Sequence, residues 1–207
     1  MSAQNPYNIC TWQPLSKCED CPLCGRLKCR FNRGDLFHFV GLFFGFALPA
    51  LIGMVKGGYH WYILGWIGFW ILFFELWEIR ILCSHCPYYA EKGIILHCIA
   101  NYGSLKLWKF NPKPISTAEK IQLIIGFIIL GGYPFPFLIV GNQFILGTIA
   151  LWGLILFFWT LQKYTCSACV NFSCVLNRVP KAVVDEYLRR NPVMRKAWEE
   201  PGWPNGN

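Results

Sequence analysis

Cysteines are the residues of this sequence whose number and spacing indicate chemistry. The chain has 11 of them, and the spacing Cys-x-x-Cys occurs at positions 18/21, 21/24, 83/86 and 166/169. Two intervening residues allow both sulfurs to reach one metal ion or one iron–sulfur cluster. The repeated spacing therefore predicts metal binding.

The predicted metal or cofactor ligands are all the cysteines except Cys10, with two histidines as further candidates. The cysteines are Cys18, Cys21, Cys24, Cys29, Cys83, Cys86, Cys98, Cys166, Cys169 and Cys174, and the histidines are His85 and His97. Cys10 fits a buried, inert thiol, because free cysteines pack as small hydrophobic residues. The spacing does not indicate which thiols share a site.

The local sequences leave two kinds of metal open. The run "CPLCG" at 21–25 is typical of zinc and rubredoxin-type knuckles, whose glycine permits the turn after the second ligand. The run from Cys18 to Cys29 approaches a bacterial iron–sulfur pattern, but its last gap is one residue longer and Arg30 replaces the final proline. We therefore expect either iron–sulfur clusters or Zn²⁺.

The composition indicates a membrane protein. Hydrophobic residues make up 55% of the chain and charged residues 14%, whereas soluble domains have about 25% charged residues. Apolar runs cover 36–55, 59–82, 121–140 and 143–161, each close to the roughly 20 residues that cross a bilayer as a helix. The predicted fold class is an all-α membrane protein with four transmembrane helices in contact with the lipid bilayer, and no secretory signal peptide is expected.

The basic residues predict the orientation of these helices. Of the 19 Lys and Arg, every one except Lys56 lies on the side that holds both termini and the central loop. Basic residues stay on the cytoplasmic side, so we expect a multi-pass protein of the cell membrane with cytoplasmic N- and C-termini. All cysteines fall on this side, where thiols stay reduced. The net charge of +8 follows from this topology and from attraction to anionic lipid headgroups, so no nucleic-acid partner is predicted.

The chain divides into five segments with an internal repeat. "ILFFELWEIRILCSHC" at 71–86 and "ILFFWTLQKYTCSAC" at 155–169 both end a hairpin of two spans. This predicts two parallel-repeated hairpins, 36–82 and 121–162. A Cys-rich N-terminal segment, 1–35, a Cys-containing loop, 83–120, and a Cys-containing C-terminal segment, 163–207, complete a cytoplasmic metal-binding module. Two short amphipathic helices are expected after residue 180, with Asn191 as the cap of the second, and Ser116 to Glu119 fits a capping box before the third span.

Glu75 and Glu78 are the candidate catalytic residues. They interrupt the second span near its cytoplasmic end and, three residues apart, would share one face of an α-helix. Such a pair could bind a proton, a quinone headgroup or an ion. The alternative is that both carboxylates reach the membrane interface and have no role in function.

Three functions remain open from these features. The first is an iron–sulfur protein, as a subunit of a membrane oxidoreductase, that transfers electrons between a cytoplasmic partner and a membrane quinone-like carrier. The second is a zinc-structured membrane scaffold or assembly factor with a protein partner, because zinc is redox-inert. No phosphate-binding loop or nucleophile elbow is present in the sequence.

The third function rests on "HCPYY" at 85–89, in the loop between the second and third spans. This stretch is similar to the DHHC S-acyltransferases, whose catalytic cysteine follows two histidines and precedes Pro-Trp. Ser84 stands in place of the first histidine. The resemblance implies a cysteine-dependent membrane enzyme with Cys86 as its nucleophile.

Overall fold

The computed structural model describes residues 5–13, 18 and 20–200 of the chain, so parts of the predicted 1–35 and 163–207 segments lie outside it. Four helical spans are long and apolar enough to cross a membrane. They are Arg33–Lys56, His60–His85, Thr117–Val140 and Phe144–Ala168. The described residues contain no β-strand, only two isolated bridges. The prediction of an all-helical protein with four such spans is confirmed.

The first hairpin consists of α1 (Arg33–Lys56) and a composite second span. That span begins as α2 (His60–Ile71), widens into the π-helical segment η3 (Leu72–Trp77) and ends in α3 (Glu78–Ile81). A 3₁₀ turn, η4 (Cys83–His85), follows directly. A π-helical turn holds more residues per turn than an α-helix, so it changes which side chains face the bundle.

The second hairpin contains α4 (Thr117–Gly132), α5 (Pro134–Val140) and α6 (Phe144–Thr160). Ser116 and Glu119 form the predicted capping box of α4. Pro134 separates α4 from α5, because proline cannot donate a backbone hydrogen bond to the preceding turn. After α6 come the π-helical η6 (Leu161–Thr165) and the 3₁₀ turn η7 (Cys166–Ala168). Each hairpin thus contains a π-helical segment near its end and a 3₁₀ turn that starts at a cysteine, with α3 between the two in the first hairpin.

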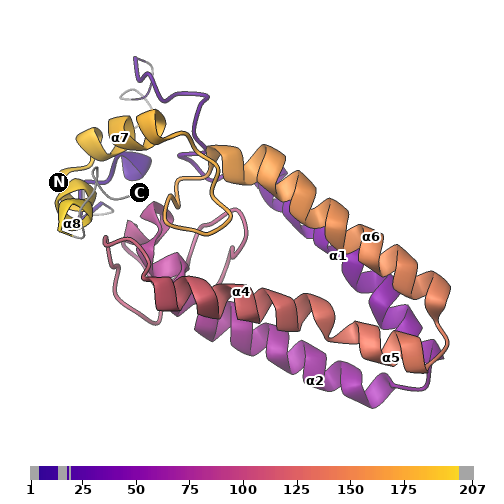
Figure 1. Ribbon diagram of the computed structural model, residues 1–207. Coiled ribbons are helices and arrows are strands. Elements are labelled where there is room, and N and C mark those ends of the chain that lie inside the picture. Colours follow the sequence, from indigo (N-terminus) through magenta and orange to yellow (C-terminus); the bar gives the residue numbers. More distant parts are fainter. Residues whose placement is uncertain (1–4, 14–17, 19, 201–207) are drawn as a thin grey trace.

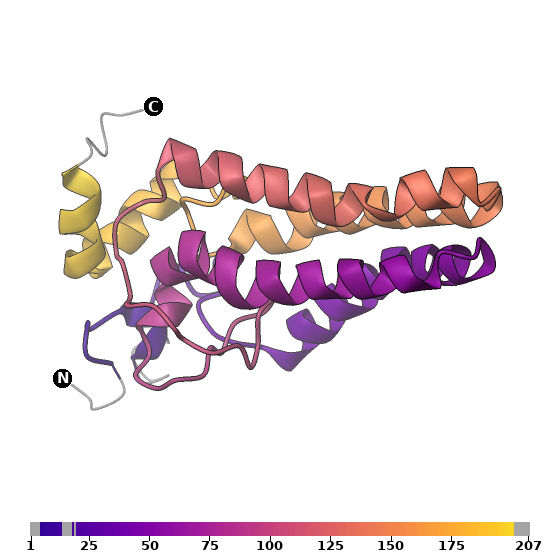
Figure 2. The same ribbon diagram turned by 90° about the horizontal axis from the view of Figure 1, so that it is seen from below.

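The helices form two pairs that diverge toward the cysteines. Figure 1 shows α1 beside α6, and α2 beside α4 and α5, with the pairs meeting at the two short hairpin turns. The backbone approach of α1 and α6 is close, since a Cβ on Gly153 would lie 2.6 Å from the Gly45 carbonyl oxygen. Figure 2 shows all the other connections, together with α7 and α8, at the opposite end.

That opposite end has a hydrophobic core of its own. It contains η1 (Cys10–Trp12), η5 (Pro87–Ala90), α7 (Lys181–Arg190) and α8 (Pro192–Glu199). Ile9, Leu23, Tyr88, Tyr187 and Trp198 are buried in one cluster, which joins the N-terminal segment to the central loop and to both C-terminal helices. The two predicted C-terminal helices are therefore present, and their apolar faces pack against the cysteine-bearing segments.

Candidate functional site

Cys10, Cys18, Cys21 and Cys29 form what we call the outer thiol group. They line one surface depression in the N-terminal segment. Burial raises the pKa of Cys29 to about 12, and the neighbouring thiols of Cys10, Cys21 and Cys18 add to this rise. Burial likewise raises the pKa of Cys10, with smaller contributions from Cys21 and Cys18. The four thiols therefore belong to one region of the surface.

Cys10 is the member of this group that sequence reasoning missed, because it belongs to no Cys-x-x-Cys pair. The backbone N–H of Cys10 donates to Asn191 Oδ1 at 2.6 Å, and Asn191 Nδ2 donates to the Cys10 sulfur at 3.2 Å. Asn191 is fully buried and occupies the predicted N-cap position of α8, but its side chain bonds to Cys10 instead of to the α8 backbone. Cys24, a predicted ligand, lines the same depression and is exposed.

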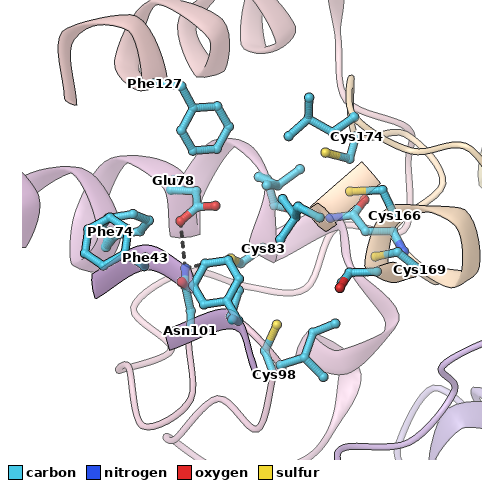
Figure 3. Close-up of a pocket in the computed structure, with 18 of the residues that line it drawn as sticks. Phe43, Phe74, Glu78, Cys83, Cys98, Asn101, Phe127, Cys166, Cys169 and Cys174 are labelled. Carbon is cyan, nitrogen blue, oxygen red and sulfur yellow. Dashed lines mark hydrogen bonds between the residues drawn. The ribbon is translucent and has the colours of Figure 1, made fainter. Parts of the chain in front are cut away.

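The inner thiol group comes from the ends of both hairpins. Its members are Cys83, Cys86, Cys98, Cys166, Cys169 and Cys174, which all line one cavity. Figure 3 shows the labelled cysteines at the same end of this cavity. Burial raises the pKa of Cys86, with contributions from Cys98 and Cys169, and burial raises the pKa of Cys174 to about 11. The fold therefore brings together thiols that are up to 91 residues apart, from Cys83 to Cys174.

The thiols do not form a closed site for a single ion. Among the described residues, no three His, Cys, Asp or Glu side chains are grouped closely enough to hold one metal ion. Zinc requires four ligands at roughly 2.0 to 2.3 Å from one centre. Cysteines that hold an iron–sulfur cluster bind different iron atoms and are spread around the cluster. Cysteine thiolates are the usual ligands of such clusters, so the type of donor is compatible with one.

The candidate histidines lie outside both thiol groups. His85 Nδ1 is 2.6 Å from the Lys113 carbonyl oxygen, and its Nε2 is 3.6 Å from Glu119. His97 Nδ1 is 2.6 Å from Glu91 Oε2. Neither ring lines the cavity or the N-terminal depression.

The two thiol groups are neighbours in the fold. Lys28, next to Cys29 in the chain, forms a parallel bridge with Cys169, and its backbone N–H donates to Ala168 O at 2.8 Å. The Tyr88 hydroxyl donates to Lys28 O at 2.6 Å. Burial raises the pKa of Tyr88, and thiols of both groups contribute to that rise. Tyr88 therefore lies between the outer and inner groups.

Glu75 and Glu78 have different environments. Glu78 is buried and lines the cavity, where its Oε2 accepts a hydrogen bond of 2.8 Å from Asn101 Nδ2. Glu75 is half-buried, accepts a 2.9 Å hydrogen bond from Ser104 Oγ and does not line the cavity. Both carboxylates accept hydrogen bonds from the same loop, through Asn101 and Ser104, but Glu78 lines the cavity and Glu75 does not.

Beyond Glu78, the cavity is apolar. It lies between the helix pairs, has a volume of about 130 Å³ and is lined by aromatic rings that include Phe43, Phe74 and Phe127. Figure 3 shows these rings on one side, the inner thiol group on the other, and the Glu78–Asn101 hydrogen bond between them. The Asn101 amide is also 3.4 Å from the Cys83 sulfur. One polar contact thus connects the carboxylate to a thiol.

The surroundings of Cys86 do not fit a nucleophile. Reactive cysteines are partly exposed and have a lowered pKa. Cys86 is buried, burial raises its pKa well above the ordinary value, and the His85 ring is held by Lys113 O. The geometry therefore offers no support for the S-acyltransferase hypothesis.

Comparisons with protein-family models, with curated proteins and with solved structures found no match for this chain. The function is therefore inferred from the residues and geometry of the site.

Proposed function

We propose that this chain is an integral membrane electron-transfer protein, a subunit of a membrane oxidoreductase, whose thiol groups hold iron–sulfur centres. Its soluble partner is a cytoplasmic protein, and its membrane partner is a quinone-like carrier. The observation that carries the proposal is the order of three features at one end of the bundle. The outer thiol group lies at the surface, the inner thiol group lies behind it, and an apolar cavity follows between the membrane-spanning helices.

This order suits transfer between an aqueous donor and a lipid-soluble acceptor. Iron–sulfur centres, when bound, would accept and release single electrons. A quinone becomes a quinol by gaining two electrons and two protons. The cytoplasmic protein would supply the electrons, and the cytoplasmic side the protons. Glu78 is the buried carboxylate beside the acceptor's position.

A cation lies beside the outer group and partly offsets the effect of burial on its thiols. Arg30 Nη2 is 3.3 Å from the Cys18 sulfur, and the charge of Arg30 lowers the pKa of Cys29 against the larger effect of burial. Cations beside a thiol favour its deprotonated form, which is the form that binds metal.

The proposal includes the orientation of the protein in the membrane and the internal duplication of its two hairpins. The distribution of Lys and Arg favours a cytoplasmic location for the cysteine end and both termini, in a cell membrane. Both hairpins have a π-helical segment in their last span and a 3₁₀ turn that starts at a cysteine, which supports two parallel repeats, although α3 lies between these two elements in the first hairpin. The repeats would explain why each hairpin delivers a Cys-Ser-x-Cys pair to the inner thiol group.

A zinc-structured scaffold or assembly factor is the second candidate. Gly25 adopts φ +74° directly after Cys24, and the Cys24 N–H donates to Cys21 O at 2.9 Å. This is the turn that a zinc knuckle uses, and it favours zinc at the outer group. In that case the metal would only hold the N-terminal segment together.

Ligand variants of the protein purified without oxygen test the proposal. Cys169→Ser should remove the iron of the inner group, and Cys29→Ser that of the outer group, because a lost ligand forfeits part of the binding free energy. Cys24→Ser is the matched control, since Cys24 is exposed, and should keep full iron content. Unchanged iron and sulfide in both ligand variants, or zinc in place of iron, would contradict the proposal.

A further inference from the structure

The cavity beside the inner thiol group has room for one planar ring. Its volume is about 130 Å³, and an apolar cavity of roughly 150 Å³ is known to hold benzene. Rings from three different spans line it, Phe43 from α1, Phe74 from η3 and Phe127 from α4. Aromatic walls of this kind favour stacked or edge-on contacts with another ring.

One wall of the cavity presents hydrogen-bond acceptors without enough donors. Among the described residues, Asn101 is the hydrogen-bond donor found for the Glu78 carboxylate, through Oε2. A carboxylate can accept several hydrogen bonds, and Figure 3 shows its second oxygen turned away from Asn101. A hydroxyl group of a ligand in the cavity could donate to this second oxygen. The wall therefore fits a ligand that carries a hydroxyl group.

A groove adjoins the cavity on the side that faces lipid. It runs between α4 and α6 and shares Phe127, Leu154 and Phe158 with the cavity wall. Its outer part includes Ile128, whose side chain is 66% exposed and would face lipid in a bilayer. An apolar molecule could therefore reach the cavity from the bilayer without crossing water.

We propose that this cavity binds the ring of a quinol or quinone, with a ring hydroxyl of the quinol donating to Glu78 and an isoprenoid-like tail leaving between α4 and α6. This proposal rests on the function proposed above and gives that function's membrane carrier a site. The ring would lie between the three phenyl rings and the inner thiol group. Electron transfer between thiol-held centres and the ring would then need no movement of the helices.

A lipid acyl chain is a poorer occupant of the same space. It would fill the apolar part of the cavity but would leave the second Glu78 oxygen without a donor. A hydroxylated ring satisfies both the apolar and the polar walls. The experiment must therefore distinguish a ring from a chain.

Binding can be measured directly on the full chain in lipid nanodiscs, without any turnover. The probe is a short-tailed quinol that carries a photoreactive azide, with equilibrium dialysis for affinity and mass spectrometry for the labelled residues. We expect one saturable site and labelling within the segments 39–46, 74–78 and 127–131, which line the cavity. Labelling confined to lipid-facing residues outside the groove would overturn the proposal.

Two substitutions on α6 form a matched pair. Leu154→Trp places a bulky ring where the cavity and the groove meet, and should weaken probe binding about tenfold or more. Leu151→Trp, one turn earlier at a position 46% exposed, should leave the affinity unchanged. Equal affinity in a folded Leu154→Trp protein would overturn the proposal. If that variant does not fold, the labelling pattern of the unaltered protein decides the question alone.

The same measurements separate this proposal from the proposed function. An iron-containing protein that binds no quinol probe would refute the cavity site and leave the iron–sulfur assignment in place. A protein that binds the probe but contains no iron would refute the electron-transfer function and keep the ring site. A tightly bound lipid that the probe cannot displace would also count against the cavity proposal.

Discussion

At the residue scale, the structure separates two carboxylates that the sequence presents as a pair. Glu78 faces the cavity, whereas Glu75 bonds to Ser104 away from it. The burial of Glu78 could not be predicted, because it depends on loop residues 101–104, which pack against the helix end. A regular α-helix is the expectation from the sequence, whereas the structure has the π-helical segment η3 at Leu72–Trp77.

Glu78→Gln and Glu75→Gln form the most informative pair of variants. Glu78→Gln keeps the shape of the side chain and an acceptor for Asn101, but removes the carboxylate charge. We expect it to slow reoxidation of the reduced centres by a quinone analogue about tenfold or more, in the range of a lost general acid–base group. Iron content should not change.

Glu75→Gln should leave the reoxidation rate as it is, because Glu75 does not line the cavity. Stopped-flow absorbance of the reduced protein, mixed with the analogue, measures both rates. An effect confined to Glu75→Gln would refute the assignment of Glu78.

The buried thiols predict a dependence on pH that differs between the metal-free and metal-loaded protein. The folded-state pKa values of Cys29 and Cys174 are about 12 and about 11, above the ordinary value of 9.0. A raised pKa means that the fold favours the protonated thiol. This stabilisation is complete below pH 9 and is lost as pH rises toward 11 or 12.

The free energy of unfolding of metal-free protein should therefore be lower at about pH 10.5 than at about pH 8, by on the order of 1 kcal/mol or more per thiol. The protein should accordingly unfold at a clearly lower temperature at the higher pH. Metal-loaded protein should not show this loss, because bound thiolates have already released their protons. Thermal unfolding of both forms at the two pH values measures the difference. Identical pH profiles would indicate that these thiols are not ligands.

At the element scale, the four spans and the two C-terminal helices could be predicted because hydropathy and capping signals are local. The π-helical turns and the position of Cys10 depend on tertiary contacts. Cys10 is the clearest example, since Asn191, at the start of α8, holds it in the outer thiol group. No sequence spacing connects residues that are 181 positions apart.

Close packing of η3 against α4 predicts the effect of two glycine substitutions in the same helix. A Cβ on Gly126 would lie 2.0 Å from a Phe73 ring carbon, whereas a Cβ on Gly132 would meet nothing within 4 Å. Gly126→Ala should destabilise the protein by about 1–3 kcal/mol, the usual cost of overpacking. Gly132→Ala should be neutral or slightly stabilising, as alanine favours helix.

Unfolding in a mixed-micelle denaturant series measures both variants against the unaltered protein. The displacement of Phe73 should also change the cavity, because its neighbour Phe74 lines the wall. Equal stability of the two variants would show that α4 and η3 are not packed as described.

At the scale of the whole molecule, the bundle places every described cysteine at one end, and the basic residues favour a cytoplasmic location for that end. A thiol reagent that cannot cross membranes should therefore leave Cys83 and Cys166 unlabelled in intact cells. In opened cells, the same reagent should label metal-free protein at Cys24, which is exposed. Mass spectrometry of the labelled peptides measures both results. Labelling of the cysteine end from outside intact cells would show that the protein has the opposite orientation in the membrane.

The central claim is that the outer and inner thiol groups hold iron–sulfur centres. Its most direct test is purification without oxygen, followed by quantification of iron, acid-labile sulfide and zinc, and by absorbance and electron paramagnetic resonance spectra before and after reduction. We expect brown protein that contains iron and sulfide in matching amounts. Its electron paramagnetic resonance signal should appear or disappear on reduction. Colourless protein that contains stoichiometric zinc, or no metal at all, would contradict it.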